Sequence, residues 1–433
     1  MSLARRERMA DIYLDNHSTT RLDPRVLEVM LPWLTDRYGN AGSTTHAAGH
    51  EAREAVEQAR RQVATAIGAS PEEVVFTSGA TESINIALLG AARRAARTRL
   101  PAIRNGGGPR DGTPVPEALA RGHIISLMTE HRAVLDPLSH LASSGCDVTL
   151  LPVTAEGWTS ADTLAAAMRP DTFLVSVLMA NNEIGTILPV SEIASVVRKS
   201  GCLFHVDATQ SLGKLPFDVD GVQADLASFS AHKLHGPKGC GCLYVRRRER
   251  TCRIDPLLYG GGQERGLRPG TLDVPAIVGF GEAAAIAVAS RVEDSTRIGS
   301  LRDRLWTSLA ERIDGIRLNG PPLSDHGRRL PHNLNVTIPG IDGQTLLAAV
   351  AARGLAISAG SACSSTEPTI SHVLKAIGLD EDSARCSLRF GLSRFTTREE
   401  IDTAADIVSS AADRLRLNAQ GDWRVGADAP TSP

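Results

Sequence analysis

Short apolar runs alternate with segments of helical period between about residues 70 and 245. The runs are nearly continuous and rich in β-branched residues, which is typical of strands that are buried on both faces of a sheet. The segment 51–67, just before the first run, places Ala52, Val56, Ala59 and Val63 on one stripe of a helix. Alternating strands and helices predict a mainly parallel sheet covered on both sides. The six runs are 74–76, 123–127, 173–178, 203–206, 226–229 and 242–245.

The pattern changes near residue 293, where a smaller α+β domain is expected. Its predicted elements are a helix at 300–313, an apolar run at 334–338, a helix at 343–353 and an apolar run at 388–390. We therefore predict a large domain at 20–292 and a small one that combines 1–19 with 293–417. The Gly/Pro-rich segment 104–116 and the tail 418–433 are expected to lack fixed structure.

Composition and charge exclude several classes of protein. A formal net charge of −2 gives no general reason to expect binding to nucleic acid or to a membrane. No apolar stretch follows the basic residues near the N-terminus, and no run of 18 apolar residues occurs, so neither a signal peptide nor a conventional membrane span is expected. Seven scattered cysteines, an odd number, favour a reducing compartment and hence a cytoplasmic location.

Polar side chains follow five of the apolar runs. They are found in 77–82, at Glu130 and His131, in 181–183, at Asp207 and Gln210, and in 230–233. Each group alone has a structural explanation, such as a helix cap, a turn or a hydrogen-bonded histidine. Ligands in an open parallel sheet bind at the carboxyl ends of the strands, however, and all five groups lie there. The sequence therefore predicts one shared pocket.

One lysine stands out among the five in the chain. Lys233 closes an apolar run at the predicted pocket, where burial favours a neutral, nucleophilic amine. The small-residue turn 77–82 can hold a phosphate at a helix N-terminus. Together with the carboxylate of Asp207 and the imidazole of His131, these groups suit pyridoxal 5'-phosphate.

Ten segments in a fixed order extend over nearly the whole chain and carry a family resemblance. They are 12–20, 38–46, 77–83, 129–136, 181–185, 205–214, 228–239, 260–271, 358–363 and 387–402. This ordered set resembles the cysteine desulfurases, the NifS/IscS-like branch of the class V aminotransferases. The resemblance implies a fold-type I enzyme with a seven-stranded sheet, which acts as a homodimer and converts L-cysteine to L-alanine.

The resemblance also implies a role for each matching residue. Lys233 matches the lysine that binds the cofactor covalently, Asp207 the partner of the pyridinium nitrogen, and Gln210 the donor to the phenolic oxygen. His131 is expected to stack on the ring and to move protons. The implied phosphate ligands are Ala80, Thr81, Ser230, His232 and, from the partner subunit, Thr271. The implied ligands of the substrate carboxylate are Asn182 and Arg389, whose planar fork suits that task.

Cys363 lies in a stretch of small residues, 359–366, where a cysteine on its own is more often inert. The resemblance implies that its thiolate attacks the substrate sulfur after Lys233 removes the Cα proton, and that a persulfide forms for transfer to an acceptor protein. The stretch 363–367 is shorter than in relatives that supply iron–sulfur scaffolds. Iron–sulfur cluster assembly, tRNA thiolation, DNA sulfur modification and a biosynthetic pathway therefore all stay open.

Two other functions remain as alternatives to cysteine desulfuration. The first is a selenocysteine lyase or another class V lyase or aminotransferase that uses the same cofactor. The second is a non-catalytic scaffold for sulfur transfer. No metal site is expected, because Cys240 and Cys242 lack a second ligand pair and His46 and His50 lack the glutamate of a zinc-binding helix. Buried packing is predicted for the two cysteines.

Overall fold

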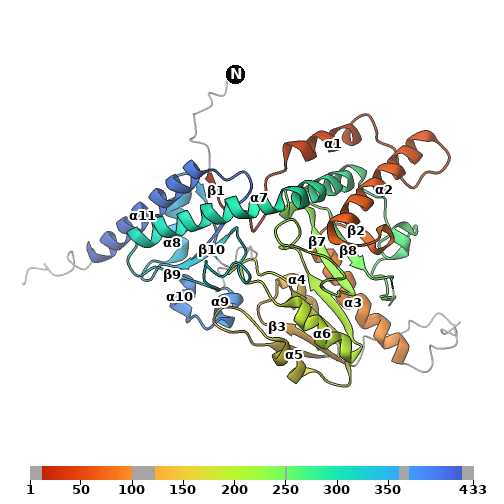
Figure 1. Cartoon of the computed structure of the whole chain (residues 1–433), viewed down its shortest axis with the longest axis horizontal. Helices are drawn as coiled ribbons and strands as arrows, with labels where there is room; N and C mark the ends of the chain where they lie inside the picture. The colour runs from red at the N-terminus through yellow and green to blue at the C-terminus, as the bar shows by residue number, and fades with distance from the viewer. Residues whose placement is uncertain (1–11, 100–121, 249–250, 360–369, 422–433) are drawn as a thin grey trace, which may run out of the picture.

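The computed structural model describes residues 12–99, 122–248, 251–359 and 370–421. A seven-stranded sheet in the order β2-β8-β7-β6-β5-β3-β4 forms its centre (Figure 1). Its strands are β2 (Val74–Thr77), β3 (His123–Leu127), β4 (Asp147–Leu151), β5 (Thr172–Leu178), β6 (Leu203–Asp207), β7 (Leu226–Ser230) and β8 (Gly241–Val245). Only β8 runs antiparallel to its neighbours, β2 and β7. The predicted α/β class, with a seven-stranded and mainly parallel sheet, is confirmed.

The edge strand β4 has no counterpart among the predicted runs. Only Leu151 of its five residues is buried, whereas β2, the strand at the other edge of the sheet, is buried throughout. A half-exposed strand carries no continuous apolar run, so the pattern that located the six other strands does not reveal it.

Helices cover both faces of the sheet, as the alternating pattern predicts. On one face, α3 (Ala80–Arg99) and α4 (Arg132–Ser143) pack against Ile124 and Leu174. On the other, α2 (Ala47–Ile67), α6 (Val190–Ser200) and the first half of α7 (Val274–Arg312) share one apolar cluster with Phe76, Val177 and Phe229. The remaining helices of this part are α1 (Pro24–Leu34) and α5 (Ala161–Ala167).

A second apolar cluster lies around a three-stranded antiparallel sheet in the order β12-β10-β9. It joins Ile12 and Leu14 from the N-terminal segment to the second half of α7. Its elements are β1 (Ile12–Tyr13), β9 (Arg317–Leu318), β10 (Asn333–Thr337), α8 (Gly343–Ala351), β11 (Leu355–Ala356), β12 (Ser387–Gly391) and α11 (Arg398–Gly421). The short helices α9 (His372–Ala376) and α10 (Glu381–Arg385) pack in a separate small cluster with Ile184. The apolar cluster around the seven-stranded sheet and the one around the three-stranded sheet are compatible with a large domain at 20–292 and a small domain of 1–19 and 293–417. These domain boundaries stay a prediction.

The long helix α7 runs through both clusters (Figure 1). Among the described residues it alone is long and apolar enough to cross a membrane by length and composition, but half of its apolar window is buried inside the protein. It packs there against α1, α2 and α11, as a core helix does. The helix α11 continues to Gly421, past the expected start of the tail at 418. The whole segment 104–116, with its surroundings from 100 to 121, lies outside the described residues, as does 422–433.

Candidate active site

A cavity of about 430 Å³ lies at the carboxyl ends of the parallel strands β3, β5, β6 and β7. Ten of the predicted site residues line it: Ala80, Thr81, His131, Asn182, Asp207, Gln210, Ser230, His232, Lys233 and Arg389. They come from six separate segments of the chain, so the fold brings them together as the strand-end pattern predicts. Thr271 does not line the cavity, and Cys363 lies outside the described residues.

Lys233 ends a short 3-10 helix, η3 (Ala231–Lys233), that directly follows β7. Its Nζ donates hydrogen bonds to the backbone carbonyls of His17 at 2.6 Å and of Ser18 at 2.7 Å. These two carbonyls belong to the N-terminal segment, whose residues 17–19 line the same cavity. The amine is therefore held at a defined position on the cavity wall.

Asp207 and His131 face the cavity from neighbouring strand ends. Asp207 is the last residue of β6 and is buried, with its Oδ1 accepting a hydrogen bond from the Thr209 N–H at 3.0 Å. His131 caps α4 by accepting the Ala133 N–H at its Nδ1, at 3.0 Å. Burial lowers the pKa of His131, and the cation of Lys233 acts in the same direction, while Asp207 opposes both. A ring whose Nδ1 accepts carries its proton on Nε2 when it is neutral.

Glu130 is a buried acid next to His131 in the sequence and close to Asp207. Its Oε1 accepts the Leu178 N–H at 2.7 Å, whereas its Oε2 has no partner among the described residues. Burial raises the pKa of Glu130 well above its usual value, and the nearby carboxylate of Asp207 raises it further. Burial therefore favours the neutral, protonated form of the Glu130 carboxyl.

The N-terminus of α3 points at the cavity through the turn before it. Gly79 has φ of 143°, a conformation that a residue with a side chain rarely adopts, and its flexibility lets the turn join β2 to α3. The helix begins at Ala80 and is 20 residues long, so its free N–H groups and dipole favour an anion there. Ser230 and His232 line the same cavity from the end of β7.

His232 is neutral at physiological pH. Its Nδ1 lies 3.1 Å from the Thr19 hydroxyl, and burial, together with Lys233, lowers the pKa of His232 to about 4. A neutral imidazole still supplies one hydrogen-bond donor to an anion.

Arg389 on β12 offers a guanidinium to the cavity from the second apolar cluster. Its Nη2 donates to Asp15 Oδ1 and to Ser18 Oγ, both at 2.9 Å, and its Nη1 donates to the carbonyl of Asn182 at 3.3 Å. Its buried Nε has no partner among the described residues. A buried guanidinium with an N–H group that has no hydrogen-bond partner is suited to bind a carboxylate ligand. The sequence motif 12–20 contains Asp15 and Ser18, but nothing in it revealed that they hold this arginine.

The described residues before and after Cys363 make hydrogen bonds to segments that line the cavity or adjoin its lining residues. On one side, Ser358 exchanges two backbone hydrogen bonds with Arg389. On the other, Ser371 donates its hydroxyl to Glu183 Oε2 at 2.5 Å, and His372 Nε2 lies 2.8 Å from the carbonyl of Glu130. The described residues before and after Cys363 are therefore hydrogen-bonded to segments that also supply His131, Asn182 and Arg389.

Glu183 gives a stability test of this attachment. Burial raises the pKa of Glu183 from 4.5 to about 7, against the opposing effects of Ser371 and Arg389. Between pH 4.5 and 7 the unfolded chain releases a proton that the folded protein retains, so Glu183 lowers stability as the pH rises through this window. The melting temperature of Glu183→Gln, relative to wild type, is therefore expected to rise by about 3 °C from pH 5 to pH 8.

The matched control for this experiment is Glu28→Gln, which changes an exposed glutamate on α1. Its difference in melting temperature from wild type is expected to stay constant with pH. A difference for Glu183→Gln that is equally flat would show that Glu183 is ionised in the folded protein throughout the range.

Cys240 and Cys242 are buried in the core around β8, as predicted. Burial raises the pKa of both thiols, so neither is a thiolate at neutral pH. In the described part of the chain no group of His, Cys, Asp and Glu could hold a metal ion. His46 has a structural role as the N-cap of α2, where its Nδ1 accepts the Gly49 N–H at 3.1 Å.

Comparison with known proteins gives the family. The model of the aminotransferase class-V family matches residues 12–101 and 115–403. Cysteine desulfurase IscS of Anaeromyxobacter dehalogenans (strain 2CP-C) is 46% identical over 94% of this chain and 93% of its own length. A mitochondrial cysteine desulfurase of Arthroderma benhamiae is 47% identical over 94% of this chain and 75% of its own length. A solved NifS-like protein superimposes with a TM-score of 0.80 at 38% identity, covering 92% of this chain and 98% of that one. The chain therefore belongs to the class-V aminotransferase family and, within it, to the cysteine desulfurases.

Proposed function

We propose that the protein is a cysteine desulfurase that uses pyridoxal 5'-phosphate to convert L-cysteine to L-alanine, with the sulfur passing to Cys363. One observation carries the proposal: ten residues expected to bind cofactor or substrate line a single cavity around Lys233. The family supports the same activity, since its curated relatives are named cysteine desulfurases.

The residues around the cavity fit the proposed cofactor. Lys233 would bind its aldehyde carbon, the carboxylate of Asp207 would pair with its ring nitrogen, and His131 would lie against its ring. The N-terminus of α3, with Thr81, Ser230 and His232, would hold its phosphate. When bound, the cofactor supplies an electron sink that stabilises negative charge at the substrate Cα.

The chain's own groups then perform the remaining tasks. Arg389 and Asn182 orient the substrate carboxylate, and Lys233, the amine nearest the reacting centre, takes the Cα proton. The thiolate of Cys363 attacks the substrate sulfur, so that an S–S bond forms while the C–S bond breaks. The electron pair of the broken bond stays with the carbon fragment, which takes up one proton at Cβ and regains one at Cα, where Lys233 can return it, before it leaves as alanine.

Replacing Arg389 with lysine tests the substrate site. The ammonium of lysine carries the same charge but cannot make the forked contacts that Arg389 makes to Asp15, Ser18 and a carboxylate. We expect the KM for L-cysteine to rise about 10- to 100-fold, with a smaller fall in kcat. Steady-state kinetics measure both constants. An unchanged KM would remove Arg389 from the substrate site.

Thr271 motivates the proposal of a homodimer. It is exposed and outside the cavity of its own chain, and its loop is fixed by Glu264, whose carboxylate accepts hydrogen bonds from Arg60 at 2.7 and 2.8 Å and from the Phe76 N–H at 2.7 Å. A phosphate contact from Thr271 therefore requires a second chain. Sedimentation or light scattering of the purified protein tests the dimer. A strictly monomeric enzyme that is fully active would contradict it.

The products of the reaction test the proposed function itself. The holoenzyme with L-cysteine and a reductant is expected to form alanine and sulfide in equal amounts. Pyruvate and ammonia instead would indicate an eliminating lyase, a keto acid would indicate transamination, and failure to retain the cofactor would favour the non-catalytic scaffold. The acceptor protein and the cytoplasmic location remain predictions, because the relatives include bacterial and mitochondrial proteins.

A further inference from the structure

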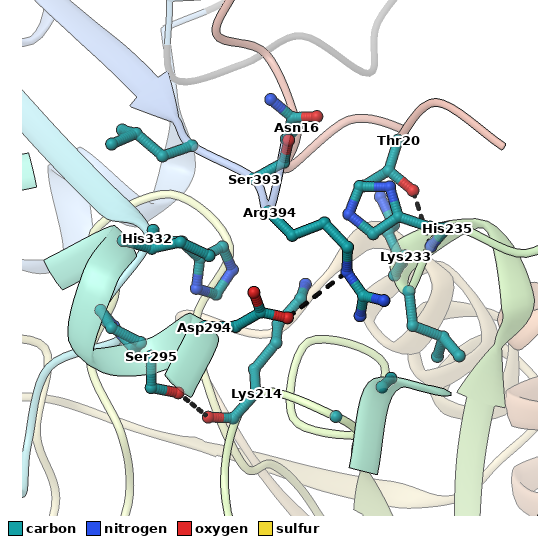
Figure 2. Close-up of a pocket in the computed structure, with 16 residues that line it drawn as sticks. Asn16, Thr20, Lys214, Lys233, His235, Asp294, Ser295, His332, Ser393 and Arg394 are labelled. Carbon is teal, nitrogen blue, oxygen red and sulfur yellow. Dashed lines mark hydrogen bonds and ion pairs between the residues drawn. The ribbon is translucent and has the colours of Figure 1, made fainter. Parts of the chain in front are cut away.

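A second, smaller cavity of about 40 Å³ adjoins Lys233, which lines both cavities. Figure 2 shows its polar lining, in which Lys214, His332, Asp294 and Arg394 surround a common space. Both ring nitrogens of His332 are buried and lack a partner among the described residues. Among the residues that line this cavity only Lys233 belongs to the proposed active site, so the role of the half-buried Lys214 is open.

Lys214 reaches from this cavity to a residue of the main site. Its Nζ donates a hydrogen bond to Gln210 Oε1 at 2.8 Å. The buried amide of Gln210 also donates from Nε2 to the carbonyl of His17 at 3.1 Å. That carbonyl is the same one that accepts the Lys233 amine. Three hydrogen bonds, through Gln210 and the His17 carbonyl, thus connect Lys214 to Lys233.

The position of Lys214 is fixed by its backbone. The preceding Gly213 has φ of 72°, and an added Cβ there would lie 2.4 Å from Ala287 Cβ on α7, so the turn packs tightly against that helix. Ser295 Oγ, also on α7, donates to the Lys214 carbonyl at 3.2 Å (Figure 2). Because both its backbone and its amine are held in place, Lys214 can fix the orientation of the Gln210 amide.

The chemistry of the two side chains determines that geometry. A protonated lysine has three donors and no acceptor, so it can face only the oxygen of an amide. The Gln210 amide therefore has one allowed orientation, with its NH2 group directed toward His17 and the main cavity. Rotation of the amide by half a turn would bring two sets of donors together at Lys214 and two acceptors together at the His17 carbonyl.

We propose that Lys214 is a positioning residue that locks the Gln210 amide so that it presents an N–H donor to the phenolic oxygen of the cofactor. This inference rests on the proposed function and adds a residue to its machinery. A locked donor favours the anionic form of that oxygen, whereas a freely rotating amide would present its carbonyl for part of the time.

The pH titration of the absorbance of the bound cofactor tests the proposal without reference to turnover. Lys214→Met is expected to raise the midpoint by about one pH unit, which is a tenfold change in proton affinity. Lys214→Arg keeps a cationic donor and is expected to restore most of the wild-type midpoint. Lys199→Met, which removes an exposed lysine from α6, is the control for loss of charge.

A double-mutant cycle separates positioning from a direct effect of the Lys214 charge. Burial and the cation of Lys233 lower the pKa of Lys214 to about 7, so the lock should be complete only below that pH. If Lys214 acts through the amide, Lys214→Met adds nothing to the shift caused by Gln210→Met. Additive shifts, or a wild-type midpoint in Lys214→Met, would overturn the proposal. A wild-type protein that binds no cofactor would instead overturn the proposed function.

Discussion

Lys233→Ala is expected to abolish alanine formation from L-cysteine, with a loss of at least about 10⁴-fold in rate. The substitution removes both the amine that would bind the cofactor and the base that would take the Cα proton, and among the described residues no other lysine amine donates to the carbonyls of His17 and Ser18. Alanine release and the absorbance spectrum of the purified variant measure the two effects. Cofactor that stays with the variant should wash out on dialysis, because only contacts to its ring and phosphate remain.

Lys199→Ala is the matched control, because this lysine is exposed on α6, outside the cavity. It should keep the rate, the spectrum and the bound cofactor of the wild type. Desulfuration by Lys233→Ala at more than about a hundredth of the wild-type rate would mean that another group performs the proton transfer.

Cys363→Ser is expected to stop sulfur release, with a fall of about a thousandfold, while the cofactor and its colour are retained. A serine hydroxyl is not a nucleophile toward sulfur at neutral pH. The Cα proton depends on Lys233 rather than on Cys363, so its exchange with solvent should continue in the variant. Sulfide release and hydrogen–deuterium exchange into L-cysteine measure the two steps separately.

Cys386→Ser provides the control, since Cys386 is a partly buried free thiol directly before β12. Its sulfide release should match wild type. Full sulfide release by Cys363→Ser with a reductant would remove Cys363 from the reaction. Cleavage of selenocysteine by a Cys363→Ala variant would favour the selenocysteine lyase, since selenium leaves without the help of an enzyme thiol.

The main site could be predicted from sequence because its residues follow the ends of neighbouring parallel strands, which lie at one edge of the sheet. His131, Asp207 and Lys233 each follow a buried run closely, so the rule for parallel sheets places them together without knowledge of any side-chain contact. The edge strand β4 escaped the same method, because exposure on one side interrupts its apolar run.

Contacts between distant segments could not be predicted. Asp15 and Arg389 are 374 residues apart and meet only because β12 lies beside the N-terminal segment. Lys214 carries no sequence signal beyond a loop between glycine and proline, and its contact with Gln210 depends on side-chain direction. The raised pKa of Glu130 depends on burial against Asp207, which no local pattern records.

The central claim is that Cys363 receives the sulfur atom of L-cysteine at the cavity built around Lys233. The most direct test is mass spectrometry of peptides from the holoenzyme after one equivalent of L-cysteine labelled with heavy sulfur, without reductant. The account predicts one added labelled sulfur atom on the Cys363 peptide, matched by one molecule of alanine. Labelled sulfur on another cysteine, or alanine formed with an unmodified Cys363, would contradict it.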